Sequence, residues 1–177
     1  MSYFLWLGLD NFYLGEIYSE SGEYEIAIDC YQKAIFFLDQ SKSFNCWIHL
    51  SEIALAKSKV LRKKQIINLD TLYNHVSKNR LRTIDGIMRR YVGEILLNID
   101  NQKIADVEDW IKKAIELDDR NRNLFSLSAD YAFYAKLFQR KGDILTAKEY
   151  FAKAIDILID CGADGWVDKY NSDLSKL

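Results

Sequence analysis

The 177-residue sequence contains no proline and only eight glycines. The turns of a β-sandwich and the glycine-rich loops of a nucleotide-binding fold depend on these residues, so both folds are disfavoured. Hydrophobic residues make up 49% of the chain, which is enough to bury a continuous core. Long helices joined by short turns are the architecture that this composition favours.

Cysteine is also scarce. Cys30, Cys46 and Cys161 are odd in number and have no C-x-x-C spacing, which disfavours both a disulfide framework and a zinc site. We therefore expect reduced thiols in a cytoplasmic protein. The apolar start of the chain has no basic leader and contains Asp10, so it does not resemble a secretion signal. No apolar run reaches the ~18 residues of a membrane span.

Residue patterns of catalysis are missing as well. His49 and His75 lie 26 residues apart without an H-E-x-x-H motif, which favours packing or surface histidines over metal ligands. There is no G-x-x-x-x-G-K motif to cradle a phosphate. Acidic groups such as Asp118 and Asp119 are typical of helix ends. The sequence therefore predicts neither an enzyme nor a cofactor nor a bound metal.

What the sequence does contain is an internal repeat. The segment from Leu14 to Ala34 returns 120 residues later, with small residues matching small ones and large residues matching large ones. A further copy begins near residues 91–95 and a weaker one near residues 50–53. We therefore predict one domain over residues 1–177 with a period near 40 residues. Its four helix pairs are expected at residues 4–39, 44–78, 81–119 and 123–159.

Close packing between paired helices explains the repeat physically. A small residue lets the partner helix approach, and bulky residues fill the remaining gaps. Glycine can also take the left-handed conformation that ends a helix. The positions expected to carry this packing are Leu14, Gly15, Tyr18, Gly22, Ala27, Tyr31, Ala34, Gly93, Ala114, Ala135, Phe138, Gly142, Ala147, Phe151 and Ala154.

The pattern L-G-x-x-Y, followed by G-x-Y-x-x-A-x-x-x-Y-x-x-A, resembles the tetratricopeptide repeat. The likeness is strong in the first and last copies and loose in the second, and the family's usual proline is missing. It implies an all-α fold, an α–α superhelix of about four helix pairs. Trp166, Tyr170 and Leu174 form one apolar stripe, which predicts a capping helix over residues 164–176.

Residues 161–170 resemble the closing segment of tetratricopeptide regions in large bacterial signalling ATPases and adenylate cyclases. This likeness implies that the chain is the regulatory or partner-binding part of a larger signalling protein. The expected function is that of a scaffold that binds another protein or peptide.

Tetratricopeptide arrays line a concave groove with the first helices of successive pairs. The residues that we expect to line it here are Phe12, Glu16, Glu52, Arg90, Glu94, Lys136 and Arg140. Chaperone-binding members clamp carboxylates with asparagine and basic side chains, and the three glutamates do not carry over that clamp. A groove acidic at one end and basic at the other predicts a ligand of opposite polarity. The alternative is that these charges are ordinary solvated groups.

Two alternatives stay open. Residues 57–90 carry ten basic and two acidic residues, so an anionic ligand or nucleic acid is a second class of partner. This stretch lacks the interleaved aromatics that stack single-stranded bases, which disfavours nucleic acid. The first helix is apolar nearly all round and is expected to be covered. Either earlier repeats of a longer protein or a second copy in a homodimer would cover it.

Overall fold

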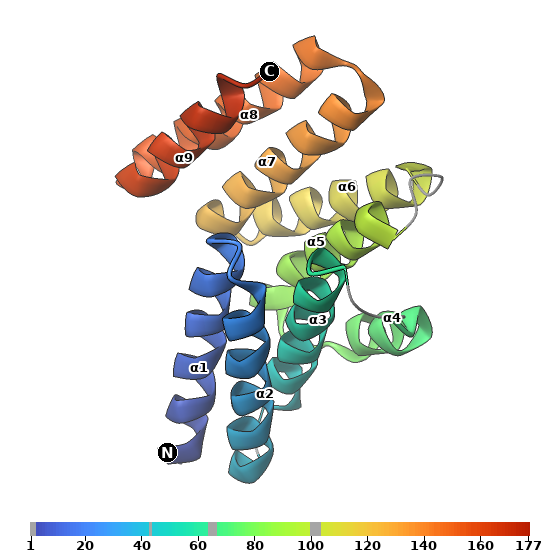
Figure 1. Ribbon diagram of the computed structural model, residues 1–177, viewed down its shortest axis with the longest axis vertical. Coiled ribbons are helices and arrows are strands. Elements are labelled where there is room, and N and C mark those ends of the chain that lie inside the picture. Colours follow the sequence, from blue (N-terminus) through green and yellow to red (C-terminus); the bar gives the residue numbers. More distant parts are fainter. Residues whose placement is uncertain (1–2, 43, 64–66, 100–103) are drawn as a thin grey trace. The chain divides into compact units, whose positions relative to one another are not determined.

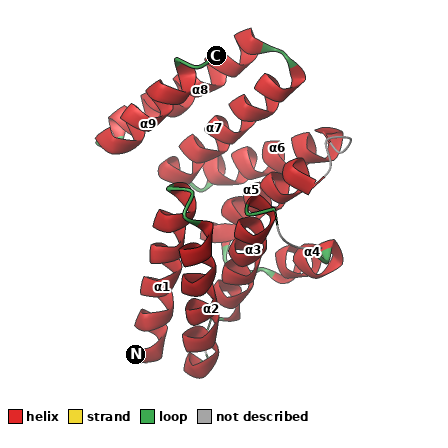
Figure 2. Ribbon diagram, in the orientation of Figure 1, coloured by secondary structure: helices red, strands yellow, loops and turns green. Residues whose placement is uncertain are grey.

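The computed structural model describes residues 3–42, 44–63, 67–99 and 104–177. These residues form nine α-helices and no strand (Figures 1 and 2). The helices are α1 (Tyr3–Glu20), α2 (Tyr24–Ser41), α3 (Asn45–Leu61), α4 (Leu69–Lys78), α5 (Arg82–Ile99), α6 (Ile104–Arg120), α7 (Leu124–Lys141), α8 (Ile144–Asp160) and α9 (Asp164–Leu174). The predicted all-α fold of helix pairs with a C-terminal helix is confirmed. Within the described residues, no helix has the length and apolarity to cross a membrane.

The chain divides into two compact units, residues 1–81 and residues 82–177. The first unit contains α1 to α4, and the second contains α5 to α9. The pairs α1/α2, α3/α4, α5/α6 and α7/α8 fall near the four predicted repeats. The expectation of a single domain stays a prediction.

Two glycines let α1 and α2 lie close together in the first unit. A Cβ atom on Gly8 would lie 2.6 Å from Cγ of Leu38, and one on Gly15 would lie 2.6 Å from Cε1 of Tyr31. Cβ atoms do not approach other carbons so closely, so the two glycines set the separation of the helices. Gly15 and Tyr31 are two of the positions expected to carry the packing, whereas the repeat pattern did not reveal Gly8.

Glycine has a different role in the turns that follow α1 and α7. Gly22 has a φ of 81° and Gly142 a φ of 80°. A Cβ atom on either residue would meet nothing within 4 Å, so the left-handed backbone, and not lack of space, favours glycine here. The N–H of Gly142 donates to the carbonyl of Gln139 at 3.1 Å and closes the end of α7.

Most of the expected packing positions are buried. At most 1% of each of the following side chains is exposed: Ala27, Tyr31, Ala34, Ala114, Ala135, Ala147, Phe151 and Ala154. Leu14 differs, because 45% of it is exposed. The helix that packs on α1 lies on the side of Gly8 and Gly15, so the prediction that Leu14 carries packing was wrong.

A hydrophobic cluster joins α7, α8 and α9 in the second unit. Its buried members are Ala132, Ala135, Phe151, Ala154, Ile155, Leu158 and Tyr170. Trp166 and Leu174 pack against this cluster from α9. The ring of Trp166 lies edge-on, with centroids 5.6 Å from Phe125 and 5.9 Å from Tyr170. The last helix therefore covers the final helix pair, as expected of a cap.

Candidate functional site

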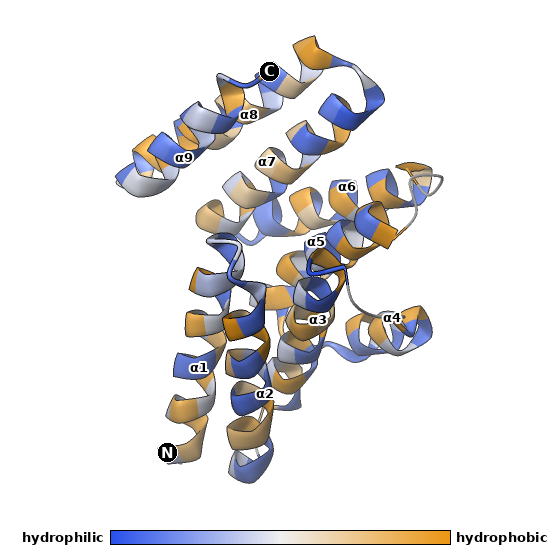
Figure 3. Ribbon diagram, in the orientation of Figure 1, coloured by the Kyte–Doolittle hydropathy of each residue, from blue (hydrophilic) through white to orange (hydrophobic). Residues whose placement is uncertain are grey.

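An apolar stripe runs along one side of α1, where apolar residues colour much of the ribbon in Figure 3. Tyr3, Trp6, Tyr13 and Ile17 are 73%, 52%, 55% and 60% exposed. Together with Asp10 they follow each other at spacings of three, four, three and four residues. This is the spacing of the a and d positions with which one helix packs on another. We call these five residues the α1 seam.

The opposite side of α1 is buried against its own unit. Leu5 and Phe12 are 5% and 3% exposed. The ring of Phe12 lies 5.9 Å from that of Tyr31 and 5.4 Å from that of Trp47, centroid to centroid. The prediction that Phe12 lines a ligand groove was therefore wrong. Because α1 is apolar nearly all round, the sequence pattern did not show which side meets the neighbouring helices.

The charge on the seam restricts what can pack there. Asp10 is the middle one of the five residues and is exposed, and α1 contains no lysine or arginine. Two copies of the seam in matching register would place Asp10 opposite Asp10, whether the helices run parallel or antiparallel. Like charges in contact disfavour that pairing, whereas a basic residue on another helix would form an ion pair with Asp10.

The three glutamates expected to line a groove each have a partner within their own unit. In the first unit, Glu16 accepts a hydrogen bond from the hydroxyl of Tyr31, and Oε2 of Glu52 lies 2.9 Å from Nε2 of His75. In the second unit, Glu94 accepts a hydrogen bond from Arg90 at 3.2 Å. A ligand would have to replace or share these contacts, and the groove stays a prediction.

Arg90 was expected on the wall of that groove, but only 8% of it is exposed. Its Nε donates to Oδ1 of Asp130 at 2.9 Å, and its guanidinium lies 4.9 Å from the ring centroid of Tyr91. Asp130 is fully buried, so its carboxylate requires a cation next to it. The prediction that Arg90 lines the groove was wrong, because its guanidinium is buried and pairs with the carboxylate of Asp130.

A second buried carboxyl, that of Asp118, belongs to the same cluster. Burial raises the pKa of both Asp118 and Asp130; Arg90 acts in the opposite direction on both. The negative charge of Asp118 raises the pKa of Asp130 further. Gly86 leaves room for this group, since a Cβ there would lie 2.4 Å from the carboxyl of Asp118. The cluster joins α5, α6 and α7 and has a structural role.

The other two basic residues of the expected groove have ordinary surface contacts. Nζ of Lys136 lies 3.8 Å from a carboxylate oxygen of Asp173 on α9. Arg140 donates to the carbonyl of Leu97 at 2.7 Å and to the side chain of Asn98 at 3.1 Å. Arg140 thereby donates to one backbone carbonyl at the C-terminal end of α5, where a cation is favourable.

Only part of the basic stretch of residues 57–90 faces solvent. Lys57 is 1% exposed, and Arg90 is buried as described above. Arg62 forms an ion pair with Glu25, and Lys64 lies outside the described residues. These observations give no support to an anionic ligand or to nucleic acid at this stretch.

Two segments of the chain, residues 12–35 and 131–157, match the family model of the tetratricopeptide repeat. The first covers the end of α1 and most of α2, and the second covers most of α7 and α8. These are the first and last copies of the internal repeat. No curated protein and no solved structure matches the chain significantly. Tetratricopeptide repeats generally mediate interactions between proteins and are typically non-catalytic.

Proposed function

We propose that this protein is a non-catalytic, protein-binding scaffold of the tetratricopeptide type, and that the α1 seam receives a helix of its partner. The observation that carries this proposal is the exposure of four large apolar side chains at the spacing of a helix–helix contact. Large apolar side chains that are exposed together on one side of a helix are typical of interaction sites. Trp6 and Tyr13 are the residue types that contribute most at such contacts.

The partner's chemistry follows from the charge of the seam. We expect an amphipathic helix with an apolar face and one lysine or arginine opposite Asp10. Self-association through the same surface would instead bring two aspartates together. A homodimer is therefore disfavoured relative to a different partner. If a homodimer were detected in solution, the helix that packs on the α1 seam would be that of a second copy of this chain.

A pair of synthetic helical peptides tests this occupant. The two peptides differ at one position only: the a position that faces Asp10 is lysine in one and glutamate in the other. All other a and d positions of both peptides are leucine. Fluorescence anisotropy should show tighter binding of the lysine peptide, with the difference shrinking in high salt because exposed charges are screened. Tyr13→Glu should weaken binding of both peptides.

The matched control is Gln32→Glu, which adds the same charge to an exposed position of α2 in the same unit. It should leave binding unchanged. Equal affinity for the two peptides would show that Asp10 does not select the partner. Equal binding by wild type and Tyr13→Glu would remove the α1 seam as the site.

The setting of this scaffold is a further part of the proposal. All three cysteines are free thiols, which fits the reducing cytoplasm. Burial raises the pKa of the Cys30 thiol, which makes this group less reactive. A role in a larger signalling protein rests on the likeness of residues 161–170 to other tetratricopeptide regions.

A further inference from the structure

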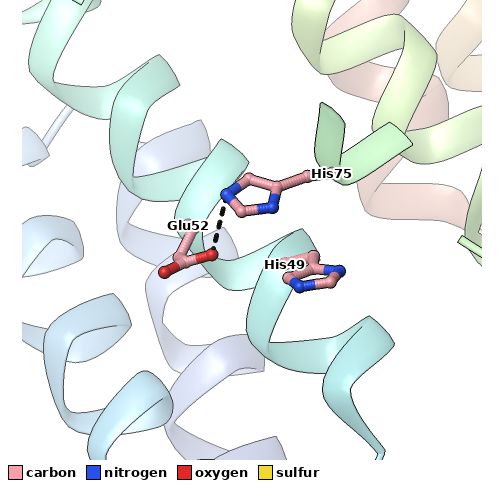
Figure 4. A group of neighbouring side chains, drawn as sticks. All are labelled: His49, Glu52 and His75. Carbon is pink, nitrogen blue, oxygen red and sulfur yellow. Dashed lines mark ion pairs between the residues drawn. The ribbon is translucent and has the colours of Figure 1, made fainter. Parts of the chain in front are cut away.

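Both histidines of the chain lie in one side-chain group with Glu52 (Figure 4). His49 and Glu52 are three residues apart on α3 and therefore share one face of that helix. His75 comes from α4, which contacts α3 and whose Leu72 and Val76 side chains are buried. The histidines lie 26 positions apart in the sequence and match no metal-binding motif, but the fold brings them together.

The ligand atoms of the three residues all lie within 4.8 Å of one another. Nε2 of His75 is 2.9 Å from Oε2 of Glu52, and the two imidazole rings are stacked with centroids 4.4 Å apart. Zinc bonds of about 2.0–2.1 Å separate neighbouring ligands of a tetrahedral ion by roughly 3.4 Å. The terminal torsions of histidine and glutamate are broad, so modest rotations can bring the group to that spacing.

We propose that His49, Glu52 and His75 bind a divalent transition-metal ion, zinc foremost, and that this ion ties α4 to α3. Two imidazoles and one carboxylate form a ligand set that zinc uses, with a water molecule in the fourth position. Imidazole nitrogen selects such ions over magnesium and calcium, which prefer oxygen ligands. The role proposed for this group is binding of the ion.

The surroundings of the group fit this role. The side chain of His75 is 13% exposed and that of Glu52 is 37% exposed, so an ion can reach a partly desolvated site. Burial lowers the pKa of both imidazoles, which leaves them in the neutral form that binds metal. Nδ1 of His75 is buried and has no hydrogen-bond partner among the described residues, whereas Nε2 of the same ring contacts Glu52. Lys78 opposes a bound cation, and its charge lowers the pKa of both histidines as well.

Nitrogen NMR of the imidazoles tests the site directly, because the chain has only two histidines and both belong to the group. Zinc is titrated into the full chain after removal of any affinity tag. We expect both imidazole spectra to shift and to saturate at one ion per chain. We also expect the unfolding temperature to rise with zinc concentration, because an ion that binds the folded state stabilises it.

Glu52→Gln keeps the shape of the side chain and removes the ligand charge. It should weaken zinc binding by more than about tenfold, the effect of losing even an outer-shell partner. The matched control is Asp70→Asn, which removes a carboxylate of α4 outside the group and should leave zinc affinity unchanged. Imidazole signals that do not move at saturating zinc, or equal zinc affinity in wild type and Glu52→Gln, would overturn the proposal.

Discussion

Replacing Arg90 by methionine tests the buried charge cluster of the second unit. Arg90 is 8% exposed and is joined to Asp130, which is 0% exposed, by a hydrogen bond of 2.9 Å. Arg90→Met keeps a long apolar side chain but leaves Asp130 and Asp118 buried without their cation. Breaking one partner of a buried ion pair costs about 3–5 kcal/mol, and we expect a loss of unfolding free energy of this size.

Native-state hydrogen exchange is the suitable assay, because amides of α5 and α7 report the second unit separately from the first. A loss of about 3–5 kcal/mol corresponds to exchange faster by roughly a hundredfold to a few thousandfold. The double variant Arg90→Met with Asp130→Leu removes both charges. It should recover part of the loss, because an apolar pair of similar volume can replace a buried ion pair, whereas Asp118 stays buried without its cation.

The pH dependence of the loss has a definite sign. Burial already raises the pKa of Asp130 above its ordinary value of 3.8, and removal of Arg90 raises it further. The folded state then holds a proton that the unfolded state releases, so stability falls as the pH rises through the folded pKa. The defect of Arg90→Met should therefore be smaller at about pH 4 than at neutral pH. A loss below about 1 kcal/mol, or a double variant no better than the single one, would refute this reasoning.

Three further predictions concern packing and surface charge. Gly15→Ala forces a Cβ against the ring of Tyr31 and should lower the free energy of unfolding by about 1–2 kcal/mol net. Gly165→Ala places a Cβ in open space on α9 and should raise the free energy of unfolding by up to about 1 kcal/mol. Urea denaturation measures both changes. Trp166→Ala should cost about 2 kcal/mol, less than a fully buried tryptophan, and a negligible change in calorimetry would show that α9 is not a cap. Hydrogen bonds from Lys112 and Lys141 lower the pKa of Glu108 to about 2. The contribution of Glu108 to the free energy of unfolding should therefore be lost as the pH falls from about 4.5 toward 2. In an acid titration, Glu108→Gln should not show this pH-dependent loss.

The helix pairs could be predicted because their cause is local in the sequence. Small residues such as Ala27 and Ala147 recur at matching positions, and close helix packing requires them. The turn glycines could be predicted as well, because Gly22 and Gly142 stand at matching positions of the repeat. Both residues adopt a positive φ in the structure. The outcome was different for α1, where apolar residues on every side hid the buried face. Gly8 and Gly15, seven residues apart, would have marked that face.

Contacts between charged residues could be predicted only where the separation of the two residues in the sequence equals the repeat period. Arg90 and Asp130 are 40 residues apart, which is the repeat period, so their pairing had a signal in the sequence. The histidine group had none, because His49 and His75 lie 26 residues apart on the two helices of one pair. How α4 packs on α3 decides their distance, and no spacing rule supplies that information.

Light scattering over a concentration series, comparing wild type with Asp10→Leu, tests the α1 seam most directly. The control is Asp29→Leu, the same substitution at an exposed position of α2 outside the seam. If the seam packs on helices and Asp10 prevents self-pairing, wild type and Asp29→Leu stay monomeric and Asp10→Leu forms dimers. A monomeric Asp10→Leu, or a wild type that already dimerises through α1, would contradict the proposal.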